Sequence, residues 1–112
     1  MTFLKYFMEN SRLETLLKSL EENPRDAFTR YLVALELTKL QRHDEALAQF
    51  AQLITEHPAY VPTYYQYAQL NENLGRTDDA IKIYKLGLTA ARNAGNFHTA
   101  SEIQAALDVL DP

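Results

Sequence analysis

Residues 43–54, HDEALAQFAQLI, set the plan of this chain, because residues 77–88, TDDAIKIYKLGL, repeat their pattern 34 positions later (78 − 44 = 34). In both copies an acidic residue opens the segment, an alanine follows two residues on, and an aromatic ring comes one helical turn after the alanine. The matched pairs are Asp44 and Asp78, Ala46 and Ala80, and Phe50 and Tyr84. Self-similarity at a fixed period of this size is typical of stacked supersecondary units.

The composition restricts the class of protein. The chain has 112 residues, of which 46% are hydrophobic and 23% charged, as in a globular domain. Its net charge of −4 argues against a nucleic-acid partner, because phosphate backbones are bound by basic faces. The chain has no cysteine, which excludes disulfides and is compatible with the cytoplasm. The N-terminal MTFLKYFM is short and interrupted by Lys5, so we expect neither a signal peptide nor a membrane span, and a cytoplasmic location.

Apolar residues recur at helical spacing in the N-terminal half. Residues 1–9 are either a first helical turn or an arm, and Ser11 and Glu14 form a capping-box pattern ahead of an apolar run that predicts a first helix. Pro24 predicts the end of this helix, and Asn23 predicts the N-cap of a second helix that runs to about Leu40. The leucines expected to form the buried stripe of the first helix are Leu13, Leu16, Leu17 and Leu20.

The C-terminal half continues this plan. Asp44 predicts the N-terminus of a third helix, where an acidic side chain meets the positive end of the helix dipole. Pro62 predicts the first turn of a fourth helix and Thr77 the N-cap of a fifth. Gly95 predicts the end of the fifth helix, and Asn96 caps a last one. No stretch alternates with period two long enough for a strand, so we predict an all-α fold of about five to six helices in antiparallel pairs.

A 34-residue helix–turn–helix unit of this kind resembles the tetratricopeptide repeat (TPR). Residues 27–60 match one full unit, residues 61–94 a second, residues 1–23 an N-terminal half unit, and residues 96–110 the capping helix that such arrays need. The resemblance implies a single domain over residues 1–112, built as an α-solenoid of antiparallel helix pairs. The best-matched positions are Ala34, Ala46, Phe50, Pro58, Tyr64, Ala68, Gly75, Ala80 and Tyr84.

Five positions depart from the family pattern. Arg30 stands where the family prefers a large apolar residue, and Gln41 replaces the turn glycine. Leu37 and Asn71 replace a usual aromatic residue. Arg92 stands where the second unit would end in proline, so we expect the second helix of that unit to run longer.

The resemblance also implies a concave groove, lined by the first helix of each pair, that holds an extended or helical peptide of a partner protein. By match to the family's groove positions, the candidate residues are Phe28, Tyr31, Leu35, Thr38, Lys39, Tyr60, Tyr65, Gln69, Glu72 and Asn73. We expect Tyr64 and Tyr67 to pack between helix pairs instead. Tyr31 and Leu35 occupy the places where some TPR proteins carry the Lys and Asn that bind a C-terminal carboxylate, so we expect no such clamp.

We predict no catalytic, metal or cofactor site. His43, His57 and His98 do not share a helix face, and no carboxylate completes a metal triad with them. The acidic pairs lie at predicted helix N-termini, where they stabilise the helix dipole. The sequence contains no phosphate-binding glycine loop and no nucleophile–base pattern, so we expect no enzymatic activity.

Two classes of function remain open. The first is a protein-interaction module, a scaffold or adaptor whose groove binds a peptide or helix of a partner. The alternative is a self-associating structural module that forms a homodimer through its aromatic N-terminal segment, Phe3, Leu4, Tyr6, Phe7 and Met8. We expect neither nucleic acid nor membrane as a partner.

Overall fold

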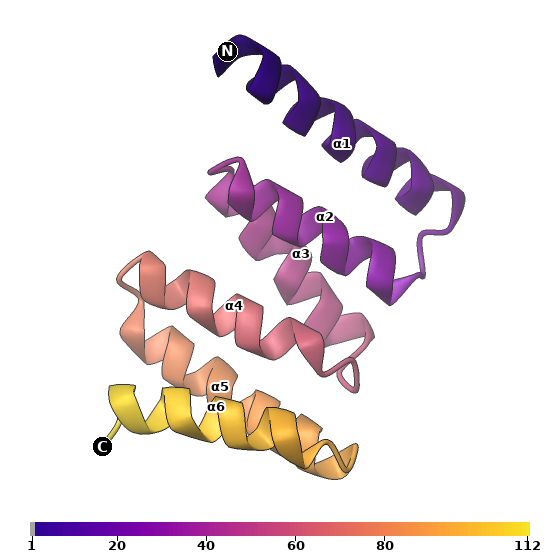
Figure 1. Cartoon of the computed structure of the whole chain (residues 1–112). Coiled ribbons are helices and arrows are strands. Elements are labelled where there is room, and N and C mark those ends of the chain that lie inside the picture. Colours follow the sequence, from indigo (N-terminus) through magenta and orange to yellow (C-terminus); the bar gives the residue numbers. More distant parts are fainter. Residues whose placement is uncertain (1) are drawn as a thin grey trace. The chain divides into compact units, whose positions relative to one another are not determined.

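The computed structural model describes residues 2–112, and side chains from residue 10 onward. The described residues form six α-helices and no strand (Figure 1), which confirms the all-α prediction. The helices are α1 (Thr2–Glu22), α2 (Ala27–Lys39), α3 (His43–Glu56), α4 (Pro62–Asn73), α5 (Thr77–Asn93) and α6 (Phe97–Leu110). They fall into two compact units: unit 1 ends at Leu53 and unit 2 begins at Ile54, inside α3.

Unit 1 is built on the packing of α1 against α2. Leu13 and Leu20 of α1 are buried, as the leucine spacing predicts. Beside them, Arg12 reaches the nearly buried carboxylate of Glu36 on α2 at 3.4 Å. The core residues that α2 and α3 contribute to this unit are Val33, Ala34, Leu37, Ala46, Phe50 and Leu53.

The first helix begins earlier than the capping-box pattern predicts. α1 starts at Thr2 and runs through Ser11, whose backbone carbonyl accepts a hydrogen bond from the Thr15 hydroxyl at 3.0 Å. Ser11 is therefore not an N-cap, because a capping residue must end a non-helical stretch. Leu17 is also not core: its side chain is 43% exposed on the outer side of α1. The side chains of the aromatic N-terminal segment lie outside the described residues.

The N-cap of α2 is Asp26, and the prediction of Asn23 is wrong. Asp26 has extended backbone angles, and its carboxylate accepts hydrogen bonds from the backbone N–H of Thr29, at 3.3 Å, and from the Thr29 hydroxyl. Asn23 and Pro24 instead belong to the turn before the helix, in which the Asp26 N–H donates to the Asn23 carbonyl at 3.1 Å. Asn23 and Asp26 are three residues apart, and the backbone conformation decides which of them caps the helix.

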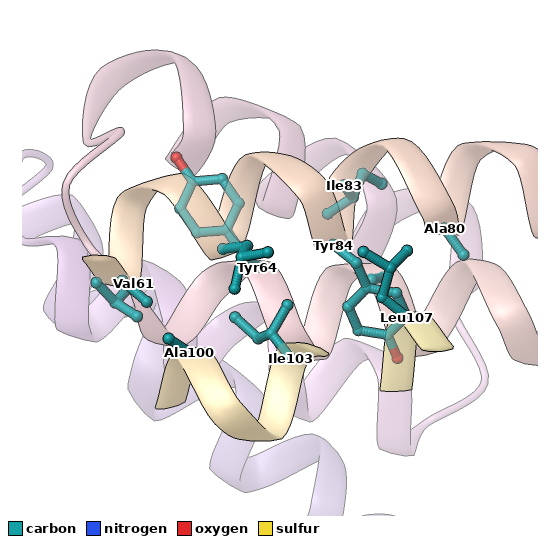
Figure 2. Packing of buried hydrophobic residues seen from close by; sticks show 11 residues of the cluster. Val61, Tyr64, Ala80, Ile83, Tyr84, Ala100, Ile103 and Leu107 are labelled. Carbon is teal, nitrogen blue, oxygen red and sulfur yellow. The ribbon is translucent and has the colours of Figure 1, made fainter. Parts of the chain in front are cut away.

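Unit 2 stacks α5 between α4 and α6, with each neighbouring pair in extensive contact. Its core contains the rings of Tyr64 and Tyr84, and Figure 2 shows them among aliphatic side chains from α5 and α6. From α6, Ala100, Ile103 and Leu107 enter this core, so the last helix covers one side of α5 within unit 2. α4 and α5 approach each other closely at Gly87, where an added Cβ would lie 2.5 Å from the Cβ of Tyr64.

Left-handed residues end the helices of both units. Gln41 and Gly75, 34 residues apart, have φ of 64° and 76°, and Gly95 has φ of 71° after α5. The Asn96 side chain then caps α6 by accepting from the Thr99 N–H at 3.1 Å, as predicted. α5 has 17 residues against 14 in α3, which confirms that the helix without a terminal proline runs longer.

The predicted N-cap of α5 is wrong by one residue. Thr77 is the first residue of the helix, and Arg76 precedes it at the N-cap position without a side-chain hydrogen bond. Asp78 and Asp79 lie in the first turn, where their charges stabilise the exposed N–H groups through the dipole. This helix start therefore depends on charge rather than on a capping hydroxyl.

Candidate functional site

In unit 1 the candidate groove residues share one face of α2. Phe28, Tyr31, Leu35, Thr38 and Lys39 follow helical spacings of three and four, so their side chains lie along one stripe. Phe28 is 56% exposed and Lys39 is exposed, whereas the other three are half-buried. The Thr38 hydroxyl donates to the backbone carbonyl one turn earlier, at 2.9 Å. This stripe offers apolar and aromatic surface with a single cation at its C-terminal end.

In unit 2 the candidates lie on and just before α4. Tyr65, Gln69 and Asn73 are spaced four residues apart on α4, with Glu72 beside them and Tyr60 two residues before the helix. Gln69 and Asn73 are exposed, and the other three are half-buried. Exposed amides can both donate and accept hydrogen bonds, so this stripe can contact the backbone of a peptide.

The ring of Tyr65 is supported by the buried ring of Tyr84. The two rings pack edge-on, with centroids 5.9 Å apart and planes at 64°. The hydroxyl of the buried Tyr84 donates a hydrogen bond to the Glu72 carboxylate. Burial, and then this hydrogen bond to an anion, raises the pKa of the Tyr84 hydroxyl. Tyr65 is thus held in place while part of its ring stays exposed, a geometry that suits a contact residue.

Tyr64 and Tyr67, also on α4, are packing residues. Tyr64 lies in the core of unit 2 and is 3% exposed, which confirms the prediction. Its hydroxyl donates to the backbone carbonyl of Pro58 at 2.5 Å. Tyr67 is half-buried and packs against the same core, and burial raises the pKa of its hydroxyl.

Arg30 forms the centre of a polar cluster inside unit 1. The sequence shows that Arg30 is unusual at its position but does not predict the residues it contacts. Arg30 is 8% exposed, and its guanidinium donates to the side-chain carbonyls of Gln49 and Gln52, at 2.7 and 3.2 Å, and to the backbone carbonyl of Pro24, at 3.1 Å. These acceptors are neutral, so hydrogen bonds rather than an ion pair hold the buried cation. The cluster ties α3 to the turn before α2 and is structural.

Within the part of the chain that the structure describes, no group of three or more histidine, cysteine or acidic side chains could hold a metal ion. His43 contacts Gln41 at 3.1 Å, and His98 contacts Glu102 at 3.2 Å on the exposed side of α6. Among residues 2–112, no helix combines the length and the apolar character that crossing a bilayer requires.

Comparison with known proteins places the chain in one family. A family model described as tetratricopeptide repeat matches residues 37–108. The chain is 43% identical to the tetratricopeptide repeat domain protein from Salinibacter ruber, whose solution structure it matches with a TM-score of 0.76 over 80% of this chain and 90% of that one. Two curated proteins of Eremothecium gossypii are also similar. Pre-mRNA-splicing factor CLF1 is 36% identical over 60% of this chain, and Protein DIA2 is 33% identical over 72%. This chain spans only 10% and 13% of their respective lengths.

More distant structures share the fold. The TPR2B-domain:pHsp70 complex of yeast Sti1 matches with a TM-score of 0.84 at 19% identity, over 97% of this chain and 87% of that one. The structure of PcrH in complex with the chaperone binding region of PopD matches with a TM-score of 0.83 at 13% identity, over 96% and 81%. At these identities the likeness extends to the fold alone.

Proposed function

Because the chain belongs to the tetratricopeptide repeat family, we propose that it is a protein-interaction module that binds a peptide or helix of a partner protein, with contact residues on α2 in unit 1 and on α4 in unit 2. Its family supports this function, as do the two complexes of the same fold, in which Sti1 and PcrH are bound to segments of other proteins. The partner is recognised without a carboxylate clamp, since Tyr31 and Leu35 fill the clamp positions.

The observation that carries this proposal is the recurrence of a half-buried tyrosine at one repeat position. Tyr31 and Tyr65 are 34 residues apart, identical, and both partly accessible on the first helix of their pairs. Tyrosine is enriched in protein interfaces because its rigid ring supplies contact area and its hydroxyl supplies a hydrogen bond. A purely structural role would favour full burial, as at Tyr64.

The test compares stability with binding in Tyr31→Ala and Tyr65→Ala. Each variant should lose no more than about 1.5 kcal/mol of stability, because only part of each ring is buried and Tyr65 loses one edge-on contact. Affinity for the partner captured from the native cell should fall by about 2 kcal/mol, roughly thirtyfold, if these rings are interface hot spots. Thermal melts and calorimetric titration measure the two quantities.

Ser101→Ala, an exposed change on α6, is the matched control and should alter neither quantity. A loss of 3 kcal/mol or more of stability in both tyrosine variants, as for truncation of a buried aromatic, would return these residues to the core. The charges on the two faces are mixed, so partner binding should depend only weakly on salt. A steep salt dependence would mean that the partner binds elsewhere.

The homodimer through the aromatic N-terminal segment stays a prediction. Light scattering of the chain with and without residues 1–9 decides it. If the shortened chain keeps the mass of the full chain at every concentration, this segment does not drive self-association.

A further inference from the structure

A hollow opens in unit 2 on a different set of residues from the α2 and α4 faces. It has a volume of about 320 Å³ and lies between α5 and the segment that joins α3 to α4. The lining residues that matter here are Pro58, Tyr64, Leu86, Thr89, Ala90 and Asn93. A smaller hollow of about 280 Å³ adjoins it and shares Pro58, Ala90 and Asn93. We call this region the α5 hollow.

The α5 hollow is uncharged and largely apolar. None of its lining residues is ionisable except Tyr64, whose hydroxyl is already bonded to the Pro58 carbonyl. Leu86 is 49% exposed, so water contacts an aliphatic side chain that a partner could cover. Thr89 and Asn93 add a hydroxyl and an amide one and two turns further along α5. The hollow therefore suits an aliphatic side chain with a peptide backbone beside it.

Cations flank this apolar surface along α5. Lys82 and Arg92 are exposed, and Lys82 lies one turn before Leu86 on the same stripe. Lys85 is close to Asp111 at 3.5 Å, but both side chains are more than half exposed, so this pair can exchange with other ions. α5 has no acidic residue beyond its first turn. An acidic segment would therefore be attracted to the rim of the hollow.

The corresponding surface of α3 lacks this chemistry. The residues 34 positions earlier than Leu86 and Ala90 are Gln52 and Glu56, and alanines stand in place of both lysines. α3 has three acidic residues, Asp44, Glu45 and Glu56, and no lysine or arginine. The apolar hollow with a basic rim is consequently a property of α5 and not of the repeat in general.

We propose that the α5 hollow binds an acidic peptide segment of a partner protein, which inserts a leucine-like side chain beside Leu86 and places carboxylates near Lys82 and Arg92. This second surface goes beyond the proposed function, which uses the faces of α2 and α4. A chain with both surfaces can join two partners, as a scaffold does.

The experiment uses the full chain labelled with 15N and a short blocked peptide of alternating leucine and aspartate as the probe. Amide shifts of Leu86, Thr89, Ala90 and Asn93 should change on titration, while those of Asp44 and Glu45, in the first turn of α3 and outside the lining, should not. A peptide with lysine in place of aspartate should bind at least about tenfold more weakly, because it meets the basic rim. Raising the salt from about 0.05 to about 0.5 M should weaken the aspartate peptide several-fold.

Two variants give α5 the residues of α3 and so supply matched controls. Leu86→Gln and Ala90→Glu should each reduce affinity for the aspartate peptide at least about tenfold. Because Ala90 is half-buried, the exposed Leu86→Gln keeps the test valid even if Ala90→Glu melts early. Equal binding of both peptides, shifts confined to α4, or no binding at all would each overturn the proposal. The proposal would also be overturned if, without peptide, Leu86→Gln sedimented as a smaller species than the parent chain. A second copy of the chain would then be what covers the hollow.

Discussion

The two repeats fill the same buried position with different chemistry. Arg30 in unit 1 and Tyr64 in unit 2 are 34 residues apart and are 8% and 3% exposed. Each donates a hydrogen bond to the backbone carbonyl of a proline at one shared repeat position, Arg30 to Pro24 at 3.1 Å and Tyr64 to Pro58 at 2.5 Å. A cation and a phenol thus make the same connection between the first helix of a pair and the turn before it.

The side chains around Arg30 and Tyr64 also differ, and each set suits its own central residue. The acceptors of Arg30, Gln49 and Gln52, correspond to Ile83 and Leu86 in unit 2, where no second acceptor is needed. Leu53 in unit 1 corresponds to Gly87, where even one added carbon would meet Tyr64. Each repeat is therefore consistent within itself, and the period in the sequence describes the backbone rather than the packing. Exchanging residues between the repeats tests this difference directly.

The largest effect is expected for Gly87→Leu, which copies Leu53 into unit 2. The new Cβ would lie 2.5 Å from the Tyr64 Cβ and 3.2 Å from Ile103 Cδ1, and the Tyr64 Cβ cannot move without its backbone. Overpacking of this kind should cost about 3 kcal/mol, seen as a lower Tm. Leu86→Gln, the exposed neighbour on α5, should change stability by less than about 0.5 kcal/mol. A Gly87→Leu variant that melts like the parent would disprove the close approach of α4 and α5.

Arg30→Tyr, which copies Tyr64 into unit 1, should cost about 2 kcal/mol in urea unfolding. The phenol can still reach the Pro24 carbonyl, but the side-chain carbonyls of Gln49 and Gln52 lose their donor in a half-buried setting. Adding Gln49→Ile and Gln52→Leu should recover at least about 1 kcal/mol, since neighbouring sites are not additive. If the triple variant loses as much unfolding free energy as the three single variants lose in total, the three residues do not act as a set.

A smaller effect is expected for Tyr84→Phe, which copies Phe50 into unit 2. Loss of the hydrogen bond to Glu72 should cost about 1 kcal/mol at neutral pH. Burial, and then that hydrogen bond, raises the folded-state pKa of Tyr84 above its unfolded value of about 10. The contribution is therefore complete below about pH 10 and is lost as the pH rises through the folded pKa.

Stability curves of the parent and Tyr84→Phe should consequently converge at alkaline pH. The reciprocal Phe50→Tyr is the control, because Thr38 stands where Glu72 would accept the hydroxyl. This variant should lose about 1 to 3 kcal/mol by burying an unpaired hydroxyl. Parallel curves for the parent and Tyr84→Phe up to pH 12 would contradict the raised pKa of Tyr84.

The smallest effect, and a favourable one, is expected for Gln41→Gly, which copies Gly75 into unit 1. Gln41 has φ of 64°, a left-handed conformation that strains any residue with a Cβ. Relief of this strain should raise stability by about 0.5 to 1 kcal/mol. The reciprocal Gly75→Gln should lower stability by about 1 kcal/mol, although nothing lies within 4 Å of its added Cβ. Opposite signs for the two variants are the decisive result.

The sequence by itself predicted an all-α fold of about five to six helices, and its 34-residue period indicated the family. The helices and turns followed from short stretches of the chain. These features depend on local signals: apolar residues at helical spacing, prolines and glycines at the ends, and acidic residues at helix N-termini. Sequence analysis also predicted correctly that Tyr64 is buried and that α5 is longer than α3. Local signals did not fix the exact helix starts: Asn23 and Thr77 were predicted as N-caps, whereas Asp26 and Arg76 hold those positions.

Only the tertiary structure decided how each repeat is packed inside. The partners of Arg30 are 19 and 22 residues away, and the contact that requires glycine at position 87 joins it to Tyr64 on another helix. Tyr65 is supported only because the ring of Tyr84, whose hydroxyl is bonded to Glu72, packs edge-on against it. A helical period states which side of a helix is buried, but the identity of the opposing side chain comes from the neighbouring helix. Burial energy depends on that neighbour, so it cannot be derived from one stretch of the chain.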